Sequence, residues 1–261
     1  MKTEKAKSIG KIILVFVLSV VIWRLTFILF DTQKFAYNVF RHIAAGLFLS
    51  FLICVLMIVM LHAERRTNSF SEKKAVSSHL KDLSFGFLCW IIPAVISIYA
   101  FVSAGQVVIV LQTESTTLIL GLLALLVAVF FIEAFPEEIT RGYLYSRLEA
   151  VFSPWAALLA QTFLFTLFAF LIGSLYSIDQ WLFIPGFGFL LGYFRMLSGS
   201  IWFSMGFHVA MMTVTQSIGP MQKLIEVDGN FFVVRFLSFV LIPAISGSII
   251  LNLKKNHIPA S

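Results

Sequence analysis

The chain has 261 residues, of which 59% are hydrophobic and only 12% are charged, and its mean hydropathy is +0.96. A soluble domain carries about 25% charged and about 45–50% apolar residues, so this composition excludes a soluble globule and a disordered chain. The net charge of +6 comes from Lys and Arg spread over several short loops, which argues against a nucleic-acid partner. We therefore expect a polytopic membrane protein.

Eight apolar stretches are long enough, or nearly so, to cross about 30 Å of hydrocarbon, which takes about 20 helical residues. In chain order they are Ile9–Phe30, Val39–Leu61, Leu83–Ala104, Leu118–Phe135, Pro154–Tyr176, Gln180–Leu197, Ser200–Gln216 and Phe231–Leu251. The sixth and seventh are short and rich in Gly and Ser, which is typical of helices that pack tightly or line a cavity. The sequence predicts an all-α bundle of about eight transmembrane helices, forming a single membrane domain over residues 1–261.

The basic residues predict the orientation of this bundle. With a cytoplasmic N-terminus, 14 of the 19 Lys and Arg residues fall in inner segments and four in outer ones. The inner ones are Lys2, Lys5, Lys7, Lys11, Arg65, Arg66, Lys73, Lys74, Lys81, Arg141, Arg147, Arg195, Lys254 and Lys255. The outer ones are Lys34, Arg41, Lys223 and Arg235. This bias predicts that both termini are cytoplasmic. The plain architecture without targeting extensions favours the bacterial cytoplasmic membrane.

Three acids and one arginine lie close together at the end of the fourth stretch. In a helix, Glu133, Glu137 and Arg141 share one face, and Glu138 reaches Arg141 at i+3. Pro136 is expected to bend or begin the helix here. Ionisable groups at membrane depth point to function by default. Two interpretations stay open: an interfacial ion-pair cluster that caps a helix, or one carboxylate that activates water while Arg141 holds the other.

His208 is the only histidine well inside a predicted span. By itself it predicts little, because a lone histidine in a membrane helix often makes only a hydrogen bond to a neighbouring helix. Two features surround it in the sequence. An Arg-Gly-Tyr-Leu run begins at Arg141, shortly after the acid pair, and a Gly-Ser-Ile-Trp run begins at Gly199, shortly before His208.

This combination resembles the CPBP family of CAAX-processing and bacteriocin-processing membrane proteases, also called the Abi family. The resemblance covers roughly residues 127–214 and fits eight helical spans. It implies a water-filled cavity in which a Glu and a His activate water to hydrolyse a peptide bond of a membrane-associated or lipidated substrate. Zinc has also been invoked for the same residues. In this chain the resemblance assigns the catalytic site to Glu137, Glu138, Arg141 and His208.

The chain departs from all three motifs of that family. In Glu-Glu-x-x-x-Arg, only two residues separate the acids from Arg141. In Phe-x-x-x-His, Ala169 stands where the histidine belongs, and in His-x-x-x-Asn, Met212 stands in place of the asparagine. Catalytic zinc takes three protein ligands, so a zinc site would have an incomplete ligand set. We therefore expect an eroded active site.

Three functions remain open at this stage. The first is an intramembrane endopeptidase with Glu137 or Glu138 as base and His208 as acid or oxyanion donor. The second is a proteolytically silent scaffold, regulator or immunity-type binding protein that uses the same cavity. The third, less favoured, is a transporter or proton path through Glu133, Glu137, Arg141 and His208. The expected partners are the lipid bilayer and a peptide or membrane protein.

Overall fold

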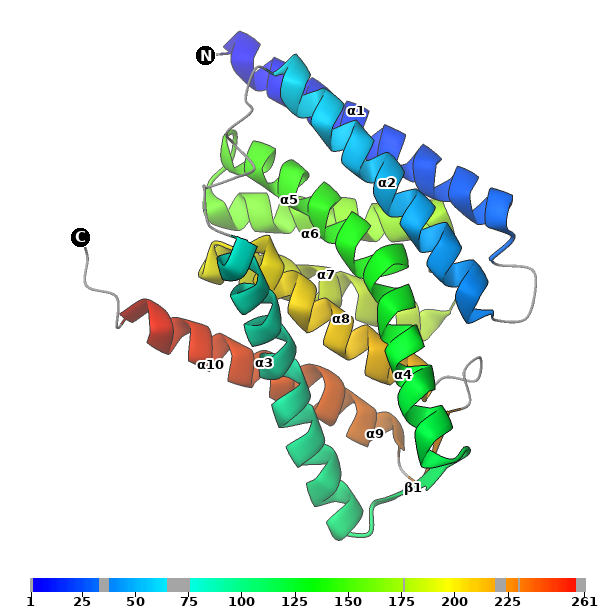
Figure 1. Ribbon diagram of the computed structural model, residues 1–261. Coiled ribbons are helices and arrows are strands. Elements are labelled where there is room, and N and C mark those ends of the chain that lie inside the picture. Colours follow the sequence, from blue (N-terminus) through cyan, green and yellow to red (C-terminus); the bar gives the residue numbers. More distant parts are fainter. Residues whose placement is uncertain are drawn as a thin grey trace.

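The computed structural model describes residues 2–32, 38–64, 76–175, 177–218, 224–229 and 231–256, and most of them are helical (Figure 1). The α-helices are α1 (Lys2–Phe30), α2 (Val39–Ala63), α3 (Val76–Ser103), α4 (Ser115–Val129), α5 (Phe135–Glu149), α6 (Pro154–Ile172), α7 (Ile178–Ser198), α8 (Ile201–Ser217), α9 (Phe231–Phe236) and α10 (Ile242–Asn256). Two π-helical turns, η1 (Phe130–Ala134) and η2 (Leu237–Leu241), join α4 to α5 and α9 to α10. Strands β1 (Val107–Leu111) and β2 (Ile225–Gly229) form one small antiparallel sheet.

The predicted membrane bundle is confirmed. Because η1 and η2 each lie inside a continuous helix, the described residues form eight helical rods, and each rod overlaps one expected stretch. Among these residues, seven rods are long and apolar enough to cross a membrane. The eighth rod, α8, is only 17 residues long. The small sheet was not predicted from hydropathy. Some residues used to predict the orientation, Lys34, Arg65, Arg66, Lys73, Lys74 and Lys223, lie outside the described residues.

The fourth rod is longer than the sequence predicted. It runs from Ser115 to Glu149 without a break and passes through Pro136. At the end of η1 the N–H of Phe135 donates to the carbonyl of Phe130, five residues earlier. In the same register the carbonyl of Phe131 faces Pro136, which has no N–H to donate. The hydroxyl of Ser50 on α2 donates to this Phe131 carbonyl at 2.7 Å. The wide turn therefore accommodates the proline ring, and Ser50 replaces the missing hydrogen bond.

Helices α3 and α8 cross with their backbones in close contact. A Cβ atom at Gly86 would lie 2.0 Å from the carbonyl oxygen of Phe203, and one at Gly206 would lie 1.9 Å from that of Leu83. Only glycine fits at such crossings, because any side chain would push the two helices apart. This contact fixes the position of α8, which carries His208 two residues after Gly206.

Two apolar clusters flank α5. One joins buried residues of α1, α2, α5 and α6, including Trp23 and Leu144. The other joins α3, α7, α8 and the η2–α10 segment, including Trp90 and Phe207. On the other side of the helices, large apolar side chains such as Leu182 are exposed, as expected for surfaces that contact lipid. The polar residues of α5 lie between the two clusters.

A group of charged and hydroxyl side chains joins α1, α2 and α5 at one end of the bundle. The side chain of Glu64, at the C-terminal end of α2, is 2% exposed. It accepts a hydrogen bond from the Tyr143 hydroxyl at 2.7 Å, forms an ion pair with Arg147, and lies 3.3 Å from Lys11 Nζ. Burial by itself raises the pKa of the Glu64 carboxyl, but the Tyr143 hydrogen bond and the charges of Arg147 and Lys11 outweigh it. The pKa of Glu64 therefore lies below its ordinary value.

Candidate active site

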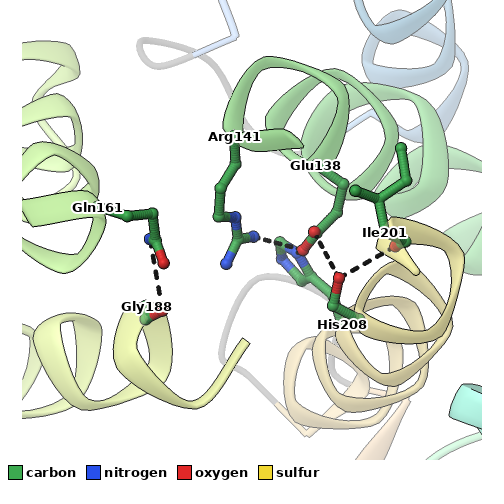
Figure 2. Close-up of polar contacts among 7 residues, drawn as sticks. Glu138, Arg141, Gln161, Gly188, Ile201 and His208 are labelled. Atoms are coloured by element: carbon green, nitrogen blue, oxygen red, sulfur yellow. Dashed lines mark hydrogen bonds and ion pairs between the residues drawn. The ribbon is translucent and has the colours of Figure 1, made fainter. Parts of the chain in front are cut away.

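The carboxylate of Glu138 is the centre of a buried polar cluster between α5 and α8 (Figure 2). One of its oxygens, Oε1, pairs with Arg141 on the next turn of α5, and His208 Nδ1 lies 3.5 Å from the same atom. The other oxygen, Oε2, accepts a hydrogen bond from the Ser204 hydroxyl at 2.8 Å. The predicted i+3 pair of Glu138 and Arg141 is thus present, and the structure brings His208 to the same carboxylate.

All four side chains of this cluster are buried, and Glu138 is only 1% exposed. A buried carboxylate is tolerated only when it is paired and hydrogen-bonded, and here both oxygens have partners. The Ser204 hydroxyl also contacts the carbonyl of Ile201, one turn earlier in α8, at 3.0 Å. The His208 ring packs edge-to-face against Phe187 of α7, with centroids 5.0 Å apart. The cluster therefore ties α5, α7 and α8 together.

The other two acids of the sequence motif have different neighbours. Glu133 lies in the π-helical turn, and its Oε1 accepts a hydrogen bond from Gln216 of α8 at 2.8 Å. Glu137 and Arg141, one turn apart, line a cavity between α1, α5 and α6. Of the three acids, Glu138 is the one whose carboxylate lies near His208, 3.5 Å from Nδ1.

The cavity is small and mostly apolar. Its volume is about 30 Å³, counted as the space that the centre of a water molecule can occupy. Its apolar walls come from Phe16, Trp23, Leu144, Leu164, Phe165 and Phe168, and its polar walls from Glu137, Thr140, Arg141 and Gln161. The Arg141 guanidinium lies 4.9 Å from the centroid of the Phe165 ring. Several buried polar atoms of the wall have no hydrogen-bond partner: Arg141 Nε and Nη1, Thr140 Oγ1 and Gln161 Oε1.

Sequence reasoning missed Gln161, which lies on α6 opposite Arg141 (Figure 2). Gln161 is 2% exposed, and its Nε2 lies 3.5 Å from the carbonyl oxygen of Gly188 on α7. Gly192 leaves room for it, because a Cβ there would lie 2.0 Å from Gln161 Oε1. The signal in the sequence is a glutamine inside an apolar stretch, because a polar residue within a membrane helix indicates function in the same way as an intramembrane histidine.

Gln161 and His208 lie at similar positions along their helices. Each is seven residues after the first residue of its helix, which corresponds to roughly 10 Å of helical rise. Ala169, where the family motif places a histidine, lies eight residues further along α6, near its C-terminal end. Gln161 and His208 also contact consecutive residues of α7, Gly188 and Phe187, so the polar side chain of α6 at the level of His208 is Gln161 and not the residue at position 169.

The ligand set does not fit a catalytic zinc ion. Within the described part of the chain, no three His, Cys, Asp or Glu side chains come together in a way that would hold a metal. Glu138 and His208 supply two groups, and the third neighbour of the carboxylate is Arg141, which has no lone pair to donate. Catalytic zinc takes three protein ligands, so we derive no chemistry through a metal.

Comparison with known proteins finds a similarity that covers this site. Residues 118–214 match the family model described as type II CAAX prenyl endopeptidase Rce1-like, and this segment is just over a third of the chain. No curated protein and no solved structure matches the chain. The matched segment contains Glu138, Arg141, Gln161 and His208, which confirms the resemblance found from the sequence. The chain is thus a CAAX-protease-like, multi-pass membrane protein.

Proposed function

We propose that this protein binds an apolar peptide or a segment of a membrane protein in the cavity between α1, α5 and α6 without hydrolysing it. The observation that carries this proposal is the state of Glu138. It is the acid that meets His208, yet Arg141 and Ser204 already engage its two oxygens. A general base must be in direct hydrogen-bond reach of a water molecule, and neither of the buried residues Glu138 and His208 lines the cavity in which water has room.

The groups that would stabilise a reacting carbonyl are also missing near His208. Ala169 and Met212 stand where the family motifs place His and Asn, and neither side chain donates a hydrogen bond. Losing one oxyanion donor lowers kcat by about 10²–10³, so the loss of two leaves little hydrolysis. Arg141 has two nitrogens without a hydrogen-bond partner. They do not replace the missing donors, because Arg141 lines the cavity beside α1 and α6.

A slow endopeptidase is the second candidate function. It is supported by the 3.5 Å separation of His208 Nδ1 and Glu138 Oε1, and by the match to an endopeptidase family. In this case His208 and Glu138 would activate a water together after Ser204 releases its hydrogen bond. The first experiment must therefore distinguish binding from cleavage.

The test compares peptide termini in membranes of cells that express wild type or the Glu137→Gln/Glu138→Gln/His208→Ala variant at matched levels. Glu149→Gln is the matched control, because this acid is exposed at the end of the same helix. We expect identical termini in all three samples, and a stoichiometric partner that co-purifies with wild type in mild detergent. New termini that occur with wild type and Glu149→Gln alone would establish the endopeptidase and overturn the proposal.

We also propose that both termini are cytoplasmic and that the membrane is the bacterial cytoplasmic membrane. The even number of helical rods among the described residues, and the 14-to-4 distribution of basic residues, support the first part. In Figure 1, α1 begins and α10 ends on the same side of the bundle.

A further inference from the structure

The cavity between α1, α5 and α6 presents hydrogen-bond donors on one wall and an acceptor on the other. Arg141 and Gln161 point toward one another from α5 and α6 (Figure 2). Arg141 has two nitrogens without a partner, and both are donors. Gln161 Oε1, an acceptor, also has no partner. All three atoms are buried, and each unpartnered buried group costs about 1–3 kcal/mol.

The cavity has room for water at these atoms. The space of about 30 Å³ holds about two or three water molecules, since each needs about 10–15 Å³ by this measure. A ligand that displaces the water must bring an acceptor for Arg141 and a donor for Gln161. It must also tolerate Glu137, which lines the same cavity.

An amide group carries both the acceptor that Arg141 needs and the donor that Gln161 needs. Its carbonyl oxygen accepts from Arg141, and its N–H donates to Gln161 Oε1. A carboxylate has no N–H for Gln161 and would lie beside the acid Glu137. An ammonium group has no acceptor for Arg141 and would lie beside its positive charge.

The rest of the cavity selects an apolar substituent. Phe16 and Trp23 from α1 and Phe168 from α6 form its apolar walls, and these side chains also pack on one another, with Trp23 and Phe168 centroids 4.9 Å apart. Such walls favour an aliphatic or aromatic group by burying its surface, at about 25 cal/mol per Å².

We propose that this cavity binds one amide group of an apolar ligand, with its oxygen on Arg141, its N–H on Gln161 and its apolar part against Phe16, Trp23 and Phe168. This inference rests on the proposed function and names the chemistry that the binding site recognises. A fatty-acid amide and a main-chain peptide group share this chemistry.

The probe is a long-chain fatty amide with a photoreactive diazirine near the amide and an alkyne at the far end, added to the full-length protein in phospholipid vesicles. We compare wild type with Gln161→Met, which keeps the size of the side chain but removes the acceptor. Thr162→Val is the matched control, since the Thr162 hydroxyl bonds to the carbonyl of Leu158 in its own helix. We expect labelled peptides around residues 16–23 and 164–168, and about 3–10-fold weaker labelling in Gln161→Met, the effect of one hydrogen bond.

Competitors identify the recognised group and its source. Unlabelled oleamide is expected to compete, whereas oleic acid is not. Stronger competition by a short apolar N-acetylated peptide than by oleamide assigns the amide to a peptide main chain, and the reverse assigns it to a lipid. Equal competition by oleic acid, or label spread evenly over lipid-facing positions such as Leu182, would overturn the proposal.

A second variant guards against misfolding of Gln161→Met. In Gln161→Glu the side chain keeps its shape, and we expect its carboxylate to pair with Arg141 and close the site, so labelling is again weaker than in wild type. Unchanged labelling in whichever of these variants retains the wild-type elution profile and Tm contradicts the inference. Failure here leaves the comparison of peptide termini unaffected, so the two proposals fail separately.

Discussion

Adjacent acids on α5 contact different helices, because consecutive residues of a helix point about 100° apart. Glu138 faces α8 and is held by Arg141 and Ser204, whereas Glu137 lines the cavity beside α1 and α6. The sequence named both as candidates for one role, and the structure separates them. One acid holds helices together, and the other faces a space that a ligand can enter.

Replacing Glu138 should destabilise the fold more than it affects any chemistry. In Glu138→Gln the buried guanidinium of Arg141 loses its counter-charge, which costs about 3–5 kcal/mol for a buried pair broken on one side. The measurement is the free energy of unfolding in mixed detergent micelles. Glu149→Gln, an exposed acid on the same helix, is the control and should stay within about 0.5 kcal/mol of wild type. A Glu138→Gln protein as stable as wild type would contradict the interpretation of the cluster as a structural link.

Glu64 should make the fold sensitive to acid. Its pKa is lower in the folded protein than its ordinary value of 4.5, so its stabilisation is fully present above that value and is lost as the pH falls below it. We expect the Tm of wild type in detergent to fall between about pH 5 and pH 3. In Glu64→Gln the Tm should be lower at neutral pH and should change less over this range. Parallel pH profiles of the two proteins would rule out this role for Glu64.

At the scale of the helices, the bundle depends on positions without side chains. Gly86 and Gly206 let α3 and α8 meet at their backbones, and Gly46 lets α2 approach η1, where a Cβ would lie 2.7 Å from the Ile132 nitrogen. The same contact brings Ser50 to the Phe131 carbonyl. Close helix packing, not ion pairs alone, therefore positions the residues of the site.

Adding one methyl group at the α3–α8 crossing should be enough to displace α8. In Gly206→Ala the new Cβ would lie 1.9 Å from the Leu83 carbonyl oxygen, so the backbones must separate, at about 1–3 kcal/mol or more. Gly10→Ala is the control, since nothing lies within 4 Å of a Cβ there, and it should stabilise α1 by about 0.5–1 kcal/mol. Unfolding free energies of both variants check this, and equal effects would argue against the close crossing.

The helices themselves could be predicted because a stretch of about 20 apolar residues has few alternatives in a bilayer. The end of the fourth helix could not be predicted. The sequence shows Pro136, but it does not show that the Ser50 hydroxyl of α2 supplies the hydrogen bond that this proline cannot make. The pairing of Glu138 with Arg141 follows from helical spacing, whereas its contact with His208 depends on how α5 and α8 pack. Gln161 was missed because its role depends on the facing Arg141, 20 residues away in the sequence.

For the whole molecule, the proposed orientation places the β1–α4 connection and the α2 end on opposite sides of the membrane. The residues Glu114 and His62 lie at these two places, and both are exposed. In a background without Cys54 and Cys89, we expect a membrane-impermeant maleimide to label Glu114→Cys in intact cells. His62→Cys should be labelled only after the membrane is permeabilised. The opposite pattern would invert the topology.

The α3–α8 crossing also has a consequence for how the protein is made. Gly86 and Gly206 are 120 residues apart, so a ribosome that adds about 5–20 residues per second needs roughly 6–24 s between them. During this interval Gly86 cannot make its native contact with α8. His208 reaches its neighbours Glu138 and Phe187 only after α8 has entered the bilayer, so assembly of the site is a late event of its biogenesis.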